Sequence, residues 1–170
     1  SDSSCDLGRE RAKELGVALV SFYVSFDGEN YYREEQDITN REFYQQMADR
    51  PGVFPRTSMP TVEDYLTVLR PMVERGEPVL CVCLNAPFSG SFQAARNARS
   101  LLMEEFPRAE VCVLDSQLAT VLQGVLVLEA VHLRDAGVSL AAAAAQLESN
   151  RKTGRIFFTT NDLEYLKHGG

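Results

Sequence analysis

Two continuous apolar runs, each followed by a segment of helical periodicity, constrain the fold of this chain most strongly. The runs are PVLCVCL at 78–84 and AEVCVLD at 109–115. Neither alternates between polar and apolar residues, so each is expected to be a strand covered on both faces. Apolar residues recur at helical spacing from Phe92 to Phe106, and a further helix is expected at 116–137. Strands alternating with helices predict an α/β fold with a mainly parallel sheet flanked by helices.

The other segments carry recognisable helix and strand signals. Thr39 and Glu42 form a capping-box pattern that predicts a helix through about Asp49. The stretch 50–60 holds three prolines and is expected to be an extended loop. The helix that begins at Thr61 is expected to bend or stop at Pro71. The remaining expected elements are a strand at 17–26, a hairpin or turn at 26–32, a helix capped by Ser139, a strand at 154–160 and a helical turn begun by Asn161 and Glu164.

The helix expected at 116–137 is apolar on nearly every side, with leucines and valines filling 118–131. A helix of this kind is normally buried all round. The 170 residues suffice for one domain with a sizeable core, but they offer little further cover for such a helix. We therefore expect a second domain or subunit to pack against it.

The charge balance excludes two classes of partner. The formal net charge is −7, and the longest basic run is Arg151-Lys152. A nucleic-acid-binding protein needs a basic stripe, and an anionic membrane surface likewise attracts basic clusters. No apolar stretch reaches the roughly 18 residues of a membrane span, so stable membrane insertion is not expected.

Cysteines and acidic residues do not form a metal-binding pattern. Cys5, Cys81, Cys83 and Cys112 include no C-x-x-C pair, which favours buried free thiols and a cytoplasmic location. The candidate acidic ligands lie at the ends of different expected elements without ligand spacing, so capping is the expected role of each: Asp2, Asp6, Asp115 and Asp162. No metal and no cofactor is expected.

The turn Ser89-Gly90-Ser91 joins the first apolar run to the helix after it. Three interpretations are open. A nucleophile elbow would need the pattern G-x-S-x-G, which is absent, and a base, for which the chain offers only His132 and His168. An anion cradle would use the unpaired N–H groups at the helix start together with the serine hydroxyls. A simple helix cap would use Ser89 alone.

A second hydroxyl-bearing segment is PRTSMP at 55–60, where Thr57 and Ser58 stand between prolines. By itself it is typical of a turn. In α/β proteins, however, ligands bind beyond the carboxyl ends of the strands. Two hydroxyl-bearing loops at one sheet edge would favour the anion cradle.

Five short motifs occur together along the whole chain. They are SDSSCDL at 1–7, PRTSMP at 55–60, SGSFQAA at 89–95, LDS at 114–116 and LEYLKHGG at 163–170. In order and spacing they resemble the DegV family of bacterial fatty-acid-binding proteins. The resemblance implies a two-domain α/β protein that buries a long-chain fatty acid between its domains and passes it to a fatty acid kinase. The kinase makes the acyl phosphate, and the binder itself does no chemistry.

The resemblance also implies a domain division and a ligand set. Residues 1–160 correspond to the N-terminal α/β domain and residues 161–170 to the start of the connection to a second domain. The family's first strand, before SDSS, and its second domain lie outside this chain.

By motif, the carboxylate ligands are Thr57 and Ser89, with Ser58 and Gly90 close by and Ser91 a further candidate. The family usually has two serines at the positions of Asn85 and Ala86, so one hydroxyl donor is expected to be lost there or replaced by an amide.

Two other functions remain open from the residues alone. A serine hydrolase would use Ser89 as nucleophile with a base from a region outside this chain. A structural or regulatory module would use the hydroxyl loops only to cap helices.

Overall fold

The computed structural model describes residues 1–160 and 163–169. Its centre is a parallel pair of strands, β4 (Val79–Cys83) and β5 (Val111–Asp115). Their register runs from Val79 opposite Val111 to Cys83 opposite Asp115. Both strands coincide with the predicted apolar runs. The predicted α/β class is confirmed by the helices that follow them.

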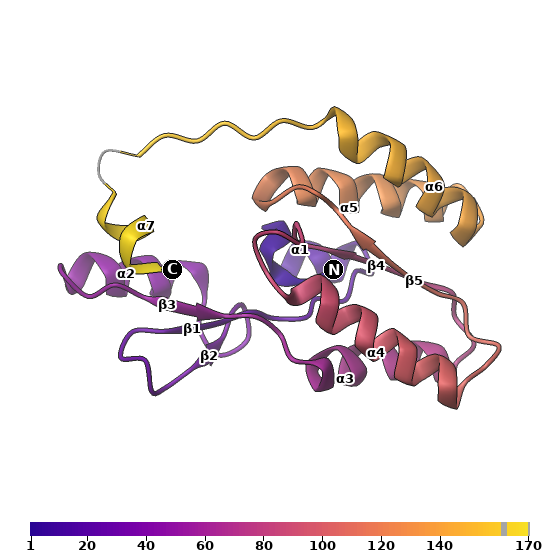
Figure 1. The fold of residues 1–170 in the computed structure, drawn as a ribbon, viewed down its shortest axis with the longest axis horizontal. Coiled ribbons are helices and arrows are strands. Elements are labelled where there is room, and N and C mark those ends of the chain that lie inside the picture. The colour runs from indigo at the N-terminus through magenta and orange to yellow at the C-terminus, as the bar shows by residue number, and fades with distance from the viewer. Residues whose placement is uncertain (161–162, 170) are drawn as a thin grey trace.

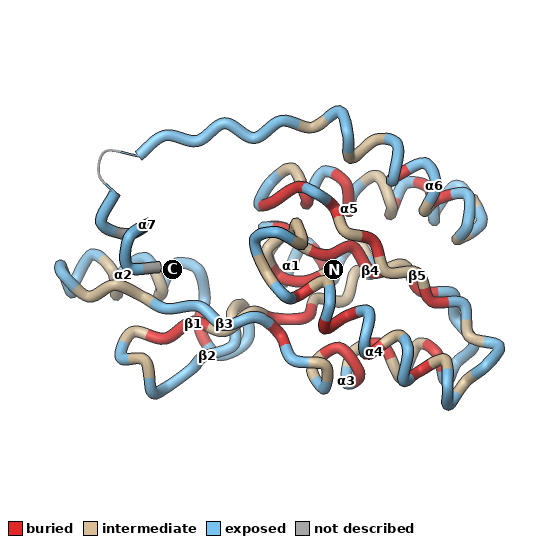
Figure 2. The backbone as a smooth tube through the Cα atoms, viewed as in Figure 1, coloured by how far each residue is buried: buried red, intermediate tan, exposed pale blue. Residues whose placement is uncertain are grey.

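Helices cover both faces of this pair (Figure 1). The helices on one face are α3 (Val62–Glu74) and α4 (Ser91–Glu105), and those on the other are α5 (Thr120–Asp135) and α6 (Leu140–Asn150). Side chains of β4 alternate between the two cores. Cys81 and Cys83 pack with α3 and α4, whereas Val82 packs with α5 and α6. Figure 2 shows the buried backbone concentrated in these layers, which explains why the runs are continuously apolar.

A second sheet is antiparallel, and the sequence pattern predicts it only in part. The hairpin expected at 26–32 is present, since β1 (Tyr23–Ser25) pairs with β2 (Tyr32–Arg33). The other edge of β1 pairs with β3 (Arg56–Ser58). The segment 50–60 is therefore not loop throughout, because the three residues between Pro55 and Met59 keep N–H groups that can pair. Helix α2 (Asn40–Asp49) lies beside this sheet (Figure 1).

The strand predicted at 17–26 is interrupted. Only Tyr23–Ser25 belongs to β1, while Val20 forms a parallel bridge with Asp2. The Val20 N–H donates to the Ser1 carbonyl and the Ser3 N–H to the Val20 carbonyl, both at 2.9 Å. Residues 17–20 and 23–25 thus pair with different segments.

The edge of β4 opposite β5 is unpaired among the described residues. It borders a cavity of about 560 Å³, lined on the far side by Gly16–Ala18 and Val20. Side chains of α3 and α5, including Leu69 and Val127, close it from the two faces. The cavity is therefore a gap within the β-layer.

The helix starts agree with the predicted caps. Thr39 accepts a hydrogen bond from the Glu42 N–H at 3.2 Å, and the Glu42 carboxylate accepts one from the Thr39 N–H at 2.9 Å. Thr61 and Asp64 form the same capping box at α3. Ser139 accepts from the Ala142 N–H at the start of α6.

Helix α3 does not end at Pro71. Of the two outcomes expected there, a bend or an end of the helix, the second is wrong. α3 runs through Pro71 to Glu74. Proline removes the hydrogen bond to the carbonyl of the residue four positions earlier, here Thr67. Thr67 and Pro71 are both exposed, so the missing hydrogen bond falls on the solvent side of the helix, where its loss is less costly.

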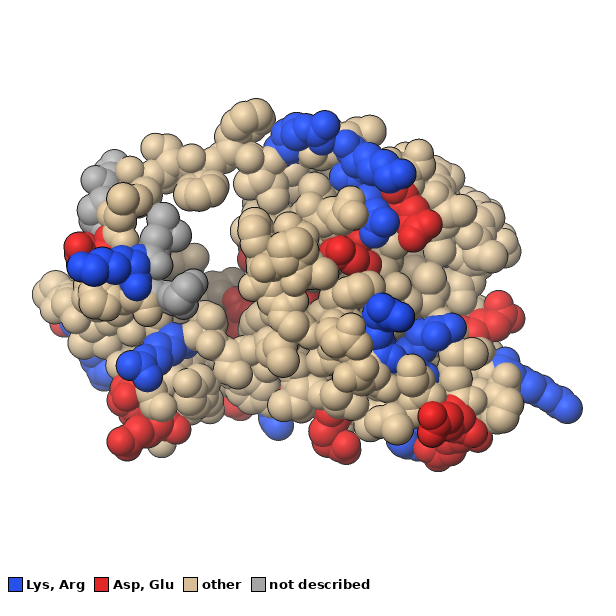
Figure 3. Space-filling model, in the orientation of Figure 1, with Lys and Arg blue, Asp and Glu red and all other residues tan. Residues whose placement is uncertain are grey.

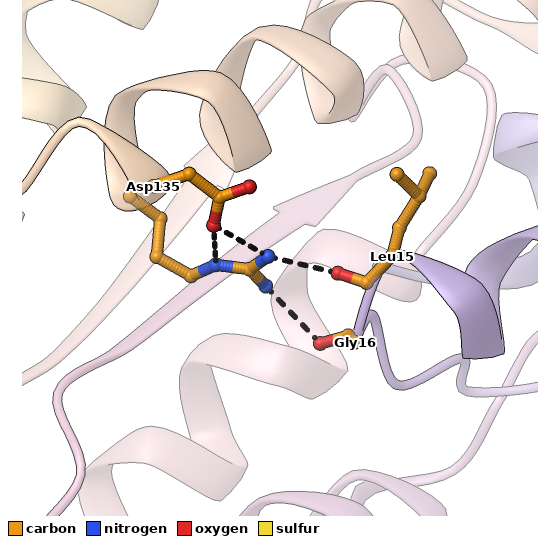
Figure 4. A network of polar contacts seen from close by, with 4 residues as sticks. Leu15, Gly16 and Asp135 are labelled. Carbon is orange, nitrogen blue, oxygen red and sulfur yellow. Dashed lines mark hydrogen bonds and ion pairs between the residues drawn. The ribbon is translucent and has the colours of Figure 1, made fainter.

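Helix α1 (Arg9–Glu14) and the short turns η1 (Ser3–Cys5) and η2 (Arg151–Thr153) are not predicted by the sequence pattern. The guanidinium of Arg134, near the end of α5, holds the end of α1 in place (Figure 4). It donates to the carbonyl of Leu15 at 2.9 Å and to that of Gly16 at 3.3 Å, and it pairs with Asp135. Carbonyls at a helix end lack partners within the helix, and a cation satisfies them well.

The outer side of α5 is exposed. The solvent-accessible fractions of Val121, Val125 and Leu128 are 68%, 52% and 39%. The expectation that α5 is apolar on most sides is thus correct, and within the described residues part of its apolar surface is uncovered.

The strand predicted at 154–160 is absent. These residues form an extended arm without strand pairing, which leads away from α6 in Figure 1. The last described element is α7 (Glu164–Gly169). Ile156, Phe157 and Phe158 are 41%, 92% and 78% exposed. An apolar, β-branched and aromatic segment becomes a strand only when a sheet edge pairs with it, and no described strand does so. Asn161, the predicted start of the last helical turn, lies outside the described residues.

Candidate functional site

The Ser89 loop, residues 84–91, begins where β4 ends and finishes at the first residue of α4. Its turn is closed by a hydrogen bond from the Phe88 N–H to the Asn85 carbonyl at 2.9 Å. The Asn85 N–H donates to the Leu118 carbonyl, and the Ala86 N–H donates to Asp115 at the end of β5. The loop therefore lies at the carboxyl ends of both parallel strands, where ligand sites of α/β folds occur.

The two serines of this loop have different environments. Ser89 is half-buried, and its Oγ accepts a hydrogen bond from the Ser91 N–H at 3.2 Å. Its hydroxyl proton has no acceptor among the described residues. Ser91 is fully buried, and its hydroxyl donates to Asp2 at 2.7 Å. Ser89 is thus a free donor, whereas the proton of Ser91 is already engaged.

The predicted second segment lies beside this loop. Thr57 and Ser58 are exposed in β3, and within the described part of the chain their hydroxyls form no hydrogen bond. The next residue, Met59, lies directly against Gly90, since a β-carbon at Gly90 would be 2.5 Å from the Met59 sulfur. The absence of a side chain at Gly90 lets the end of the Met59 side chain approach the backbone closely. The structure therefore brings together the two hydroxyl-bearing segments from different sheets.

Asp2 is a buried acid at the centre of a polar network, and sequence reasoning assigned it only to capping. It precedes η1 but makes no side-chain capping bond. Instead its Oδ2 accepts from the Leu84 N–H at 3.0 Å and from the Ser91 hydroxyl at 2.7 Å. Its Oδ1 accepts from Ser4 and from Gln123 of α5, each at 2.7 Å. The only sequence signal for this role is the SDSS motif itself.

Tyr65 of α3 completes the network. Its hydroxyl lies 2.7 Å from the Ser91 Oγ and donates to Asp2 at 3.4 Å. Burial, followed by the ionisable neighbours Cys83 and Asp2, raises the pKa of Tyr65 well above its usual value. The phenol therefore keeps its proton. Because the Ser91 proton points to Asp2, the single phenol proton of Tyr65 is shared between the Ser91 Oγ and Asp2.

No described residue gives Ser89 a catalytic base. His132 is exposed on α5, and His168 stacks on Phe54 with ring centroids 4.2 Å apart and faces Glu164 at 3.5 Å. Neither histidine is hydrogen-bonded to Ser89. Across the described residues there is also no cluster of three or more His, Cys, Asp or Glu side chains placed to hold a metal ion.

The other predicted features have mixed outcomes. Asp115 caps the end of β5, accepting from the Ala86 and Gln117 N–H groups. Asp162 lies outside the described residues. The cavity beside β4 is lined along that strand by Val79–Val82, and none of the candidate ligand residues lines it. No helix among the described residues is both long and apolar enough to span a bilayer.

Comparison with known proteins identifies the relatives of this arrangement. The family model described as "Uncharacterised protein, DegV family" matches residues 1–170. The chain belongs to the DegV family. A DegV domain-containing protein of Clostridium acetobutylicum is 32% identical over 170 residues, covering all of this chain and 58% of that protein. The resemblance seen in the five motifs is thereby confirmed.

Two solved structures of DegV relatives extend the comparison. A stearic acid-binding protein of Eubacterium ventriosum is 46% identical with a TM-score of 0.93, covering 99% of this chain and 58% of that one. A fatty-acid-binding DegV family protein of Thermus thermophilus is 37% identical with a TM-score of 0.81, covering 99% and 57%. The chain thus spans somewhat more than half the length of these relatives.

Proposed function

We propose that the protein containing this chain binds a long-chain fatty acid. The acid's carboxylate accepts hydrogen bonds from the hydroxyls of Thr57 and Ser89 at the N-terminus of α4. Ser58 and the Asn85 amide lie at the edge of this head-group site, and Gly90 allows the close approach of its two sides. The observation that carries the proposal is the packing of Met59 on Gly90, which joins two segments with free hydroxyl donors.

The tail supplies most of the affinity in this proposal. An acyl tail of about 15 methylenes is worth about 12 kcal/mol gross when buried, at about 0.8 kcal/mol each. The start of a helix adds only about 0.3–2 kcal/mol at the head group. The exposed apolar residues of α5 and of the arm are suited to contact the tail together with a second domain. The hydroxyls fix where the carboxylate points.

The protein acts in this proposal as a carrier in the cytoplasm and not as an enzyme. Thr57 and Ser58 are exposed, so a carboxylate at this site remains accessible to a second protein. The resemblance to the DegV family supports a fatty acid kinase as that protein. A fluorophosphonate probe that labelled Ser89 stoichiometrically would instead support a serine hydrolase.

Titration of the full-length protein with oleate tests the head-group assignment. Thr57→Ala and Ser89→Ala each remove one donor to a charged group, which costs about 1–3 kcal/mol, so each variant is expected to bind oleate about tenfold more weakly. Ser100→Ala is the matched control. Ser100 is exposed on α4, and its hydroxyl donates only to the Arg96 carbonyl of the same helix. Equal affinities of all three variants and the parent would contradict the assignment.

A further inference from the structure

Asp2 stands out because it is a fully buried carboxylate without a cationic partner among the described residues. Every bond it accepts comes from a neutral group: two serine hydroxyls, a tyrosine hydroxyl, an amide side chain and a backbone N–H. Burying a charge in this way is costly unless its hydrogen bonds are complete. Such a group is expected to have a role beyond packing.

One oxygen of Asp2 holds both ends of the Ser89 loop. Oδ2 accepts from the N–H of Leu84, the first residue after β4, and from the hydroxyl of Ser91, the first residue of α4. The other oxygen, Oδ1, is fixed from the opposite side by Ser4 and by Gln123. The carboxylate thus works as a clamp that closes the loop at its base.

The contacts of Asp2 reach Ser89, whose hydroxyl proton has no acceptor among the described residues, through Ser91. Ser91, held by Asp2, donates its backbone N–H to the Ser89 Oγ at 3.2 Å. With its oxygen acting as acceptor toward the protein, Ser89 keeps its proton for a group outside the loop. A hydroxyl oxygen that accepts a hydrogen bond is a stronger donor through its own proton, so the bond from the Ser91 N–H strengthens Ser89 as an outward donor.

We infer that Asp2 is a positioning residue for the bound carboxylate, acting through Ser91 to orient the Ser89 hydroxyl. This inference rests on the proposed function. It predicts a specific defect. When Asp2 is altered, recognition of the carboxylate weakens while contacts with the acyl tail persist.

The test compares two ligands in full-length protein, oleate and oleyl alcohol, which share a chain and differ in the head group. Asp2→Asn keeps the size of the side chain but turns an NH₂ group toward donors that need an acceptor. The variant is expected to bind oleate about tenfold more weakly and oleyl alcohol with unchanged affinity. A general loss of structure would weaken both ligands alike.

Ser100→Ala is the matched control, because Ser100 is exposed on α4 and its hydroxyl donates only to the Arg96 carbonyl, outside the hydrogen-bond network of Asp2. Its preference for oleate over the alcohol should equal that of the parent. Should Asp2→Asn fail to fold, Ser91→Ala cuts the same link and carries the same expectation. An unchanged preference in Asp2→Asn or Ser91→Ala overturns the inference. A parent protein that does not prefer oleate to the alcohol overturns the proposed function instead.

Discussion

Ser89 and Ser91 are two residues apart, yet their hydroxyls differ in what they can offer a ligand. The proton of Ser91 goes to Asp2, a buried carboxylate, and Ser91 accepts from the tyrosine of α3. Ser89 receives an N–H and retains its proton. An anion binds hydrogen-bond donors, so Ser89 is suited to the proposed carboxylate. Ser91 holds the Ser89 oxygen through its backbone N–H.

Glu34 gives a pH-dependent prediction at the same scale. Burial, opposed by a hydrogen bond from Ser3 and assisted by the nearby acids Asp6 and Glu35, raises the pKa of Glu34 above its ordinary value. The folded state therefore holds this proton more tightly than the unfolded state. The resulting stabilisation is complete below about pH 4.3, the unfolded value, and is lost as the pH rises through the folded pKa.

Replacement of Glu34 by glutamine removes this titration. The free energy of unfolding of the parent, relative to Glu34→Gln, should therefore decline from pH 4 to pH 7. Urea denaturation at several pH values measures it. A difference that stays flat or grows with pH would contradict the raised pKa.

The residues of the candidate site could be predicted to different extents. Thr57 and Ser89 lie in short motifs that the sequence displays, and the structure brings their segments together. The role of Asp2 could not be predicted from local patterns. Its partners Ser91 and Gln123 are 89 and 121 residues away, so only the folded chain reveals the clamp.

At the scale of elements, α3 connects the two sheets. Its capping box joins Thr61 to Asp64, and Asp64 also accepts a hydrogen bond from the Tyr23 hydroxyl of β1 at 2.7 Å. Thr61→Ala should lower the free energy of unfolding by about 1 kcal/mol, the usual cost of a lost N-cap. Thermal and chemical denaturation measure the loss.

Thr67→Ala is the control for that substitution, because Thr67 is an exposed threonine within α3 that caps nothing. It should be neutral or slightly stabilising, since alanine favours the helix. If both variants lose the same stability, the effect belongs to threonine in general and not to the cap.

Helices and strands were predicted correctly where the signal lies in neighbouring residues. The prediction failed where the structure of a segment depends on what packs or pairs with it. Continuous apolar runs predicted β4 and β5. A capping serine or threonine predicted where the helices α2, α3 and α6 begin. The arm at 154–160 has the composition of a strand but no described strand pairs with it. α3 continued through Pro71, which lies on its exposed side. Pairing and solvent exposure are tertiary properties.

At the scale of the whole molecule, the described surfaces are incomplete in two places. The outer side of α5 and the arm expose large apolar side chains, and β4 has an unpaired edge beside a cavity of about 560 Å³. Charged groups are spread over the face in Figure 3 without a continuous basic stripe, in keeping with the net charge of −7. Exposed apolar side chains, rather than a charged patch, are therefore the surface feature here that is typical of an interaction site.

The central claim is that the full-length protein carries a long-chain fatty acid, and mass spectrometry tests it most directly. The protein is purified natively, denatured and extracted, and the extract is searched for acyl chains, with a parallel incubation in added oleate. The account predicts about one long-chain fatty acid per protein molecule, lowered by combined Thr57→Ala and Ser89→Ala substitutions. An extract without acyl chains, together with no uptake of oleate, would contradict it.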